Sequence, residues 1–258
     1  MATGTPQANV SQTVLKAIDV LECIATAKDP LSAPEVAQQC GLSRPTAYRL
    51  LTTLQSRGYI ANEQTGLYHL GMSVLNLSKN LLDHLDLRDL AKPYLSELSR
   101  NSHETTHLGI LDDLAVYYVE KVESSQAVRM TSVIGASNPL HCTAMGKAIL
   151  AFLPEEQRTA LVKRIDFEAR TPQTITDIAT LNKYLETVRE QGFAIDDMED
   201  VEGIRCIGAP IFNHEGIAFA AISVSGPAYR LSIARLTELS NSVLNAAKKI
   251  SSQLGYTP

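Results

Sequence analysis

Residues 31–70 read LSAPEVAQQCGLSRPTAYRLLTTLQSRGYIANEQTGLYHL, and they carry the signals of two short helices followed by a hairpin. Ser32, with Glu35 three residues later, has the pattern of a capping box and predicts the start of the first helix. The glycine within residues 40–42 favours a tight turn, and Ser43 then predicts the N-cap of the second helix. Two short helices, a tight turn and a hairpin in this order predict a winged helix-turn-helix.

The second helix has two distinct faces. Ala47, Leu50, Leu51 and Leu54 follow the spacing i, i+3, i+4 and i+7, which predicts one buried stripe. Polar and positively charged side chains lie on the other face near the helix start, where Pro45 is tolerated in the first turn. In a helix-turn-helix that part of the second helix contacts base edges and phosphates in the major groove. The candidate DNA-contacting residues are Ser43, Arg44, Pro45, Thr46, Tyr48 and Arg49.

The wing is predicted from the residues that follow Gly58. Residues 59–61 and 67–70 have strand-like composition, and the turn between them runs from Asn62 to Gly66. The alternative is a generic helical hairpin with a solvated polar face. The agreement of cap, turn, buried stripe and wing favours DNA binding.

Charge supports a local DNA-binding surface, since the chain as a whole is acidic. The net charge of −5 argues against a protein that is coated for nonspecific DNA binding. Residues 36–62, in contrast, contain Arg44, Arg49 and Arg57 and no Asp or Glu. A surface that contacts phosphates needs cations and would be weakened by carboxylates. A dimer would double this modest positive charge.

Length and composition predict a globular protein of one large or two ordinary domains. The chain has 258 residues, of which 45% are hydrophobic, and no apolar run reaches membrane-spanning length. The first residues lack the basic start and apolar stretch of a signal peptide, so residues 1–10 are expected to be a disordered lead. Four scattered cysteines without a CxxC pair favour reduced thiols. We therefore expect a cytoplasmic protein without a membrane partner.

Three parts follow from the periodicity of apolar residues. A helix over residues 12–27 is expected to complete a DNA-binding domain of residues 11–71. Its expected packing face consists of Val14, Ile18, Leu21 and Ala25. Residues 72–102 are broadly apolar and predict linker helices, which favour a dimer contact over a free spacer. Residues 103–258 predict a mixed α/β domain.

The pattern of this last part predicts a largely antiparallel sheet flanked by helices. Short turns join neighbouring strand-like runs, which is typical of hairpins. Strand-like runs occupy residues 105–111, 115–122, 128–134, 193–196, 205–212 and 217–224. Helix-like runs occupy residues 143–152, 155–164, 178–191 and 232–254.

His103, Glu104 and His107 match the H-E-x-x-H pattern of zinc peptidases. That chemistry needs a helix, because only there do residues i and i+4 reach one metal. Here the pattern enters a strand-like run, in which four residues span about 13 Å, and no clear third ligand follows. There is also no P-loop, no G-x-G-x-x-G and no G-x-S-x-G. The metallopeptidase alternative is therefore not favoured, and we expect neither an enzyme nor a cofactor.

A candidate ligand site lies in the second domain. Residues 142–148 follow a turn and open an apolar helix, whose free amides suit an anion. Ser223 and Ser225 point to the same side of an otherwise apolar strand, and buried hydroxyls need partners. The alternative is that they bond to the backbone and that Cys206 is a small core residue. The residues alone leave both interpretations open.

Four blocks of the chain are found together in one known family. They are residues 31–60, residues 138–150 (NPLHCTAMGKAIL), residues 203–210 (GIRCIGAP) and residues 220–227 (AAISVSGP). In their order and spacing, from about residue 11 to 256, the chain resembles the IclR family of bacterial transcriptional regulators. The resemblance implies a winged helix-turn-helix and a C-terminal GAF-like α+β effector domain. It also implies dimers, often paired into tetramers, that respond to a small organic acid and regulate, most often repress, a catabolic operon.

Carried over to this chain, the resemblance places an effector carboxylate near the amides of Thr143 and Ala144. The polar positions around it correspond to Asp196, Cys206, Ser223 and Ser225, and the apolar wall to Met130 and Ile204. The surrounding segments look most like the branch of the family that senses 2-keto-3-deoxygluconate. Such a pocket suits a sugar acid or hydroxy acid, and a plain keto acid nearly as well. A third hypothesis is a small-molecule sensor whose winged domain binds a protein and not DNA.

Overall fold

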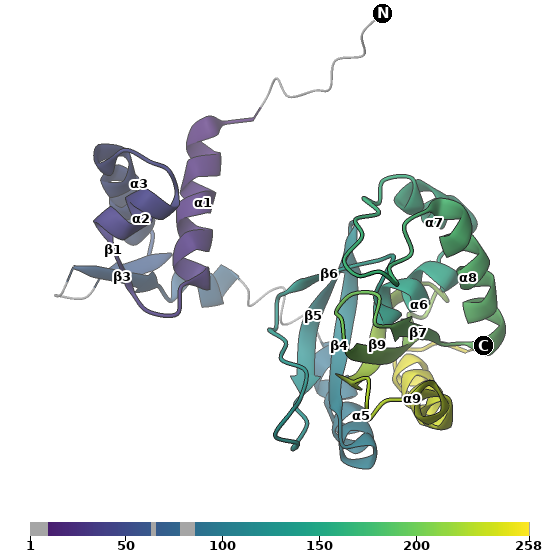
Figure 1. Ribbon diagram of the computed structural model, residues 1–258. Helices are drawn as coiled ribbons and strands as arrows, with labels where there is room; N and C mark the ends of the chain where they lie inside the picture. Colours follow the sequence, from purple (N-terminus) through teal and green to yellow (C-terminus); the bar gives the residue numbers. More distant parts are fainter. Residues whose placement is uncertain (1–9, 63–65, 78–85, 258) are drawn as a thin grey trace, which may run out of the picture. The chain divides into compact units, whose positions relative to one another are not determined.

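The computed structural model describes residues 10–62, 66–77 and 86–257, and Figure 1 shows their helices and strands. The chain forms two compact units, Met1–Leu85 and Asp86–Pro258. The predicted disordered lead lies outside the described residues except for Val10. Within the described ranges, no helix combines the length and apolar character needed to cross a membrane.

Three helices form most of the N-terminal unit: α1 (Gln12–Thr26), α2 (Ala33–Gln39) and α3 (Arg44–Ser56). The capping box at the start of α2 is present. The backbone N–H and the hydroxyl of Ser32 donate to Glu35 Oε2 at 2.8 and 2.6 Å. Ser43 holds the N-cap position of α3, but its side chain makes no capping bond to the backbone. Its hydroxyl lies 2.8 Å from that of Thr46 and is engaged there.

A small antiparallel sheet completes this unit. It contains β1 (Leu31–Ser32), β2 (Ile60–Asn62) and β3 (Leu67–Leu70) in the order β1-β3-β2. Gly58 lies between α3 and β2, and its φ of 72° is the left-handed conformation that favours glycine. The two strands of the predicted wing are therefore present. Residues 63–65 of its predicted turn lie outside the described part of the chain.

The predicted packing face of α1 was wrong. Val20 and Ile24 are buried in the core of the unit, whereas Val14 and Ile18 are 56% and 44% exposed. Ala25 is also exposed, and of the predicted face only Leu21 packs partly against the core. The helix carries two adjacent apolar stripes, and periodicity alone does not say which one its own chain covers.

The C-terminal unit is built on a six-stranded, fully antiparallel sheet in the order β6-β5-β4-β9-β8-β7. Figure 1 shows α5 and α9 on one face of this sheet and α6, α7 and α8 on the other. The strands are β4 (Thr105–Asp112), β5 (Ala115–Val122), β6 (Ser137–Pro139), β7 (Ala194–Asp197), β8 (Ile204–Phe212) and β9 (Ala218–Pro227). The helices are α5 (Asp86–Ser102), α6 (Ala144–Phe152), α7 (Glu155–Val162), α8 (Ile178–Gln191) and α9 (Ile233–Gln253).

Helix α5 packs against this sheet, although its residues were predicted to be part of a linker over residues 72–102. Its apolar stripe, which includes Leu87, Ala91 and Leu95, is buried. The Thr106 hydroxyl of β4 donates to Leu95 O at 3.0 Å. The α5 part of the apolar face that suggested a contact between subunits is thus covered within the chain, whereas Leu75 and Leu77 of its first part are exposed. Of the rest of the predicted linker, residues 73–77 are helical and residues 78–85 lie outside the described ranges.

The strand predicted over residues 128–134 is absent, and this segment is irregular. Side chains take two of its carbonyl groups: Val128 O accepts from Arg230 Nη2 at 2.7 Å, and Ser132 O from Lys121 Nζ at 2.6 Å. The neighbouring edge of β5 is paired with β6 instead. The strand-like composition of residues 128–134 therefore did not predict their structure.

Candidate functional site

The two faces of α3 are separated as the sequence predicts. Ala47, Leu50 and Leu51 are buried against the other helices of the unit. The polar face is open to solvent, and Tyr48 is 62% exposed. Of the six candidate DNA-contacting residues, Ser43, Arg44, Pro45, Tyr48 and Arg49 are exposed and Thr46 is half-buried. The structure therefore brings all six to one accessible end of α3.

The start of α2 lies on the same surface. Ala33 and Pro34 line a shallow hollow together with Arg44, Pro45 and Tyr48. The start of α2 carries the Glu35 carboxylate in its capping box, so the positive charge of this surface comes from the start of α3 and its arginine side chains. Such a surface suits the phosphates of a nucleic-acid backbone, while α3 offers side chains that reach base edges.

In the C-terminal unit, all eight candidate effector residues line one cavity. Its volume is about 10 Å³, which leaves room for about one water molecule. The predicted lining residues are Met130, Thr143, Ala144, Asp196, Ile204, Cys206, Ser223 and Ser225. Tyr118, Met145, Asp200 and Val201 complete the lining.

Strand register explains how residues so far apart in sequence meet. Cys206 of β8 lies between Asp196 of β7 and Ser225 of β9, and directly paired residues share one face of a sheet. Ser223 is paired with Gly208 in the next row of that face. A Cβ on Gly208 would lie 3.1 Å from the Ala144 carbonyl carbon, so the glycine lets the start of α6 approach the sheet.

The start of α6 lines this cavity and has backbone amides that the helix itself does not use. The Thr143 hydroxyl accepts from the Gly146 N–H at 3.1 Å and caps the helix, and it donates to Pro139 O at 2.6 Å. The first amides of a helix have no carbonyl partner within it, which leaves those of Ala144 and Met145 for another acceptor. Both residues line the cavity.

Asp196 is the buried acid of the cavity, with 3% of its surface exposed. Burial raises its pKa to about 7, against the opposing effect of the Lys147 ammonium. Asp196 Oδ1 accepts from the Glu199 N–H at 2.8 Å, and the Glu199 carboxylate binds the fully buried Lys147 of α6. Lys147 also lies 4.5 Å from the centre of the Tyr184 ring. This network holds the Asp196 carboxyl of β7 in place through side chains of α6 and α8.

The cysteines of this region are neutral thiols. Burial, followed by the nearby Asp196 carboxyl, raises the pKa of Cys206 well above its usual range. Burial likewise raises the pKa of Cys142, whose thiol lies 3.7 Å from Asp200 Oδ1. Neither has the thiolate character of a nucleophile or a metal ligand. Cys206 therefore contributes a small, weakly polar wall to the cavity.

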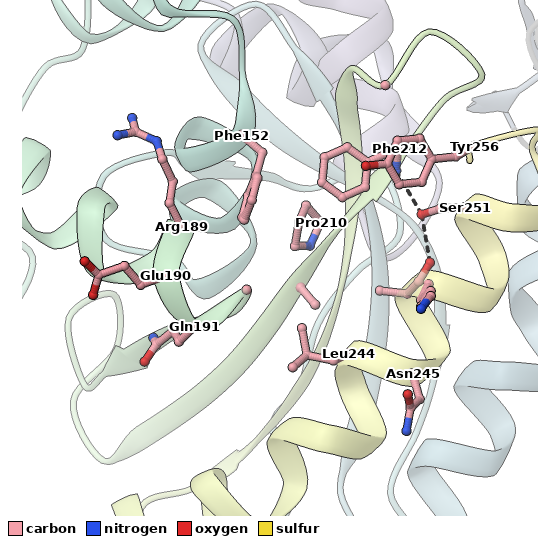
Figure 2. A pocket seen from close by; sticks show the side chains of 15 residues that line it. Phe152, Arg189, Glu190, Gln191, Pro210, Phe212, Leu244, Asn245, Ser251 and Tyr256 are labelled. Atoms are coloured by element: carbon pink, nitrogen blue, oxygen red, sulfur yellow. Dashed lines mark hydrogen bonds between the residues drawn. The ribbon is translucent and has the colours of Figure 1, made fainter. Parts of the chain in front are cut away.

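A much larger cavity, of about 580 Å³, lies between the end of α8, strand β8 and α9 (Figure 2). It contains none of the predicted effector residues. Figure 2 shows Phe152, Pro210, Phe212 and Tyr256 around it, together with side chains from α9. Its charged side chains, Arg189, Glu190 and Lys248, are solvent-exposed. We favour the smaller cavity for an acidic ligand, because it combines a buried carboxyl, two buried hydroxyls and free helix amides.

The H-E-x-x-H residues do not form a metal site. His107 lies in strand β4, and its Nε2 is 2.8 Å from Ser132 Oγ. The Glu104 carboxylate is bound by Arg230 through contacts of 2.5 and 2.8 Å. Among the residues that the structure describes, no group of three His, Cys, Asp or Glu side chains could hold a metal ion.

Sequence reasoning missed the residues behind the cavity. Lys147 and Glu199 hold Asp196 in place, and Tyr118 and Asp200 extend the lining. One signal was available: a lysine within the apolar helix AMGKAILAF predicts a buried cation that needs an acidic partner. The partner itself, 52 residues away in sequence, carries no local signal.

Comparison with known proteins shows the family. The model for the bacterial transcriptional regulator IclR C-terminal domain matches residues 79–252, and the IclR helix-turn-helix domain matches residues 13–64. The HTH-type transcriptional regulator KdgR of Escherichia coli (strain K12) is 36% identical over 94% of this chain and 92% of its own length. The transcriptional repressor IclR of the same organism is 34% identical over 97% and 92%.

A solved structure agrees with these matches. The Thermotoga maritima IclR structure has a TM-score of 0.81 and 33% identity, and the match covers 95% of this chain and 99% of that one. The relatives are transcriptional regulators. The winged unit with its exposed α3 and the separate sheet domain are the two parts that these family models describe. The chain therefore belongs to the IclR family of bacterial transcriptional regulators.

Proposed function

We propose that this regulator represses a catabolic operon by binding operator DNA through α3 and that a small carboxylate effector controls this binding. One observation carries the proposal. An exposed, arginine-bearing helix face in one unit accompanies, in the other unit, a cavity lined by a buried acid, serines and helix amides. The first suits duplex DNA, and the second suits a small anion with hydroxyl or keto groups. Because the relatives include a named repressor, we propose repression over activation.

On DNA, the N-terminal half of α3 would lie in the major groove. Arg49 and Tyr48 are exposed one turn inside α3, where side chains reach base edges, and Arg44 lies at its start near the phosphates. Residues 36–62 hold no carboxylate to oppose them. This favours DNA over a neutral or basic protein partner, which would not need such a one-signed surface.

The DNA contact is tested by Arg49→Ala in a quantitative gel shift with an operator from the region upstream of the protein's own gene. We expect a loss of about 1–3 kcal/mol of binding free energy, the range for one specific base or phosphate contact. Arg100→Ala removes the same charge from an exposed position of α5 and serves as the control. Unchanged operator binding by Arg49→Ala would remove the assignment of α3, and it would favour a protein partner for the winged unit.

Self-association is part of the proposal, because an operator read by a winged helix-turn-helix normally has two half-sites. The second apolar stripe of α1 supports it, since Val14, Leu15 and Ile18 are each at least 40% exposed. Burial against a second copy would remove this surface from water. We propose a dimer or a pair of dimers, and sedimentation of the full chain at several concentrations tests it.

In the effector cavity, the ligand carboxylate would accept from the amides of Ala144 and Met145 and from the hydroxyls of Ser223 and Ser225. Asp196, with its pKa raised to about 7 by burial, can donate to a carboxylate or carbonyl when protonated. When ionised it can accept from a ligand hydroxyl. Asp200 is held by Arg170, whose Nε lies 2.6 Å from its Oδ1. This set suits a hydroxy or keto acid, including sugar acids.

A thermal-shift screen of sugar acids, keto acids and aromatic acids tests this site. A ligand at a hundred times its Kd adds about 2.7 kcal/mol of stability. We expect the Ser223→Ala, Ser225→Ala double variant to lose that response. Asn245→Ala, in the larger cavity, is the matched control and should keep it. The opposite result would place the ligand in the cavity of Figure 2.

Effector binding would alter operator affinity through residues 72–102, which join the two sites in the chain. The size of the effect is limited by the difference in effector affinity between the DNA-bound and free arrangements, and it is reciprocal. Operator DNA should therefore change effector affinity by the same factor as the effector changes operator affinity. Titration calorimetry of the effector with and without the operator measures this factor.

A further inference from the structure

An imidazole lies directly behind the serines of the candidate effector cavity. His107 of β4 is completely buried and does not itself line the cavity. Its strand partner is Ser223, and its Nδ1 lies 3.4 Å from Ser223 Oγ and 3.5 Å from Ser225 Oγ. The ring stacks on Tyr118, with centroids 4.5 Å apart and an interplanar angle of 21°. Three of the lining residues thus rest against this one ring.

The other ring nitrogen faces a different element. His107 Nε2 lies 2.8 Å from the hydroxyl of Ser132, in the irregular segment of residues 123–136. Met130 of this segment lines the cavity, and it lies between two carbonyls, those of Val128 and Ser132, that Arg230 and Lys121 hold. His107 therefore connects the serines of the cavity floor to the segment that supplies its apolar wall.

The ring is neutral, so its two nitrogens have opposite roles. Burial, with the Lys121 ammonium nearby, lowers the pKa of His107 to about 3. In a neutral imidazole one nitrogen donates and the other accepts. If Nδ1 carries the proton, it donates to the serine oxygens, and neither serine uses its proton on the imidazole. Nε2 then accepts from the Ser132 hydroxyl. In the other tautomer a serine donates to Nδ1 and has one donor fewer for a ligand.

We propose that His107 is a positioning residue of the effector site, which holds Ser223 and Ser225 as donors for an anion and ties the segment of residues 123–136 to them. The inference rests on the proposed effector function of this cavity. An anion needs hydroxyl donors, so its binding selects the Nδ1–H form, in which Nε2 accepts from the Ser132 hydroxyl. The imidazole thereby joins the serines that would bind the anion to the segment that carries Met130.

The test compares His107→Phe with His107→Asn. Phenylalanine keeps a ring against Tyr118 and removes both nitrogens. Asparagine lacks the ring, but its amide NH2 is bonded to Cγ, as Nδ1 is in histidine, and it can donate to the serines. The probe is whichever of gluconate, pyruvate and 2-keto-3-deoxygluconate binds the unchanged full-length chain most tightly by calorimetry. We expect His107→Phe to weaken its binding about tenfold and His107→Asn to remain within about threefold of the unchanged chain.

Thr106→Val is the stability control, because Thr106 lies on the other face of β4 and its buried hydroxyl bonds to α5. It should lower the unfolding temperature and leave probe affinity unchanged. Ser132→Ala tests the second contact, and it serves if His107→Phe does not fold. We expect faster amide hydrogen exchange in residues 125–134 and about threefold weaker binding.

The outcomes separate this inference from the proposed function. If the Ser223→Ala, Ser225→Ala variant loses the probe while His107→Phe keeps it, only the role of His107 is overturned. The same holds if His107→Asn binds as weakly as His107→Phe, or if Ser132→Ala changes neither exchange nor affinity. If none of the three acids binds, or if the double serine variant binds as well as the unchanged chain, the effector site fails, and the inference with it.

Discussion

The candidate DNA-contacting surface of α3 and the candidate effector cavity of the C-terminal unit use side chains in opposite ways. On α3 five of the six candidate contacts are exposed, and the buried stripe lies on the other face of the helix. In the cavity the polar candidate contacts are themselves buried, and Asp196, Ser223 and Ser225 are each at most 3% exposed. Changes on α3 should therefore alter function without altering stability, whereas changes around the cavity should alter both.

The largest expected effect is on the buried ion pair. Lys147→Met leaves the Glu199 carboxylate buried without its cation, and burial already raises the pKa of Glu199. Removal of one partner of a buried pair typically destabilises by about 3–5 kcal/mol. Calorimetric unfolding should show this loss in the C-terminal unit alone. The exposed Lys163→Met is the control, and adding Glu199→Gln should restore part of the loss. An unchanged unfolding temperature would contradict the assigned network.

Gly208→Ala should come next. The added methyl group would meet backbone atoms of Ala144 and Ile222 at 3.1–3.2 Å, and α6 would have to shift. Overpacking of this kind typically destabilises by about 1–3 kcal/mol. Because α6 carries the cavity amides, the thermal shift produced by the effector should fall as well. Loss of stability with a full effector response would show that the position of α6 does not control the site.

The acid of the cavity predicts a pH dependence of stability. The pKa of Asp196 is raised from 3.8 to about 7 in the fold, so between these values the folded chain binds more protons than the unfolded chain. Its contribution therefore falls as pH rises through this window, by at most about 1.4 kcal/mol per pH unit. The pKa of His107, lowered to about 3, gives the opposite slope below pH 6.5.

The two slopes are separated by comparing the unchanged chain with Asp196→Asn. The difference in unfolding free energy between them should decline from pH 4 to pH 7 and become constant above that. The exposed Asp166→Asn should show no such decline. A constant difference across the whole window would contradict the raised pKa.

The smallest effect on stability is expected for Tyr48→Ala. Tyr48 is 62% exposed, and exposed substitutions typically change stability by less than about 0.5 kcal/mol. Operator affinity should nevertheless fall severalfold in the gel shift, because the side chain lies beside Arg44 and Arg49. A variant that binds the operator normally but unfolds easily would reverse the comparison between the two regions.

The same contrast explains what the sequence could predict. The face of α3 is local, since one stripe of Ala47, Leu50 and Leu51 determines which side chains remain exposed. The cavity is formed by residues of distant strands that the strand register brings together. Its residues were predicted from the family resemblance and not from local patterns. Sequence spacing correctly places Ser43 at the N-cap of α3. It does not show whether the Ser43 hydroxyl bonds to the backbone or, as here, to the Thr46 hydroxyl. Two predictions were wrong for a related reason: the packing face of α1 and the strand over residues 128–134. Periodicity does not show which other part of the molecule a helix face or a strand contacts.

The small volume of the cavity bears on how the regulator would respond over time and concentration. With about 10 Å³ available, an organic acid can enter only a rearranged form of the protein in which Met130 or a neighbour has moved aside. Apparent affinity is then the intrinsic affinity multiplied by the population of that form, so that one open molecule in a hundred weakens it about a hundredfold. The effector concentration at which the operator is released would be set by this internal equilibrium. A shorter side chain at position 130 would lower that concentration without adding any contact to the ligand.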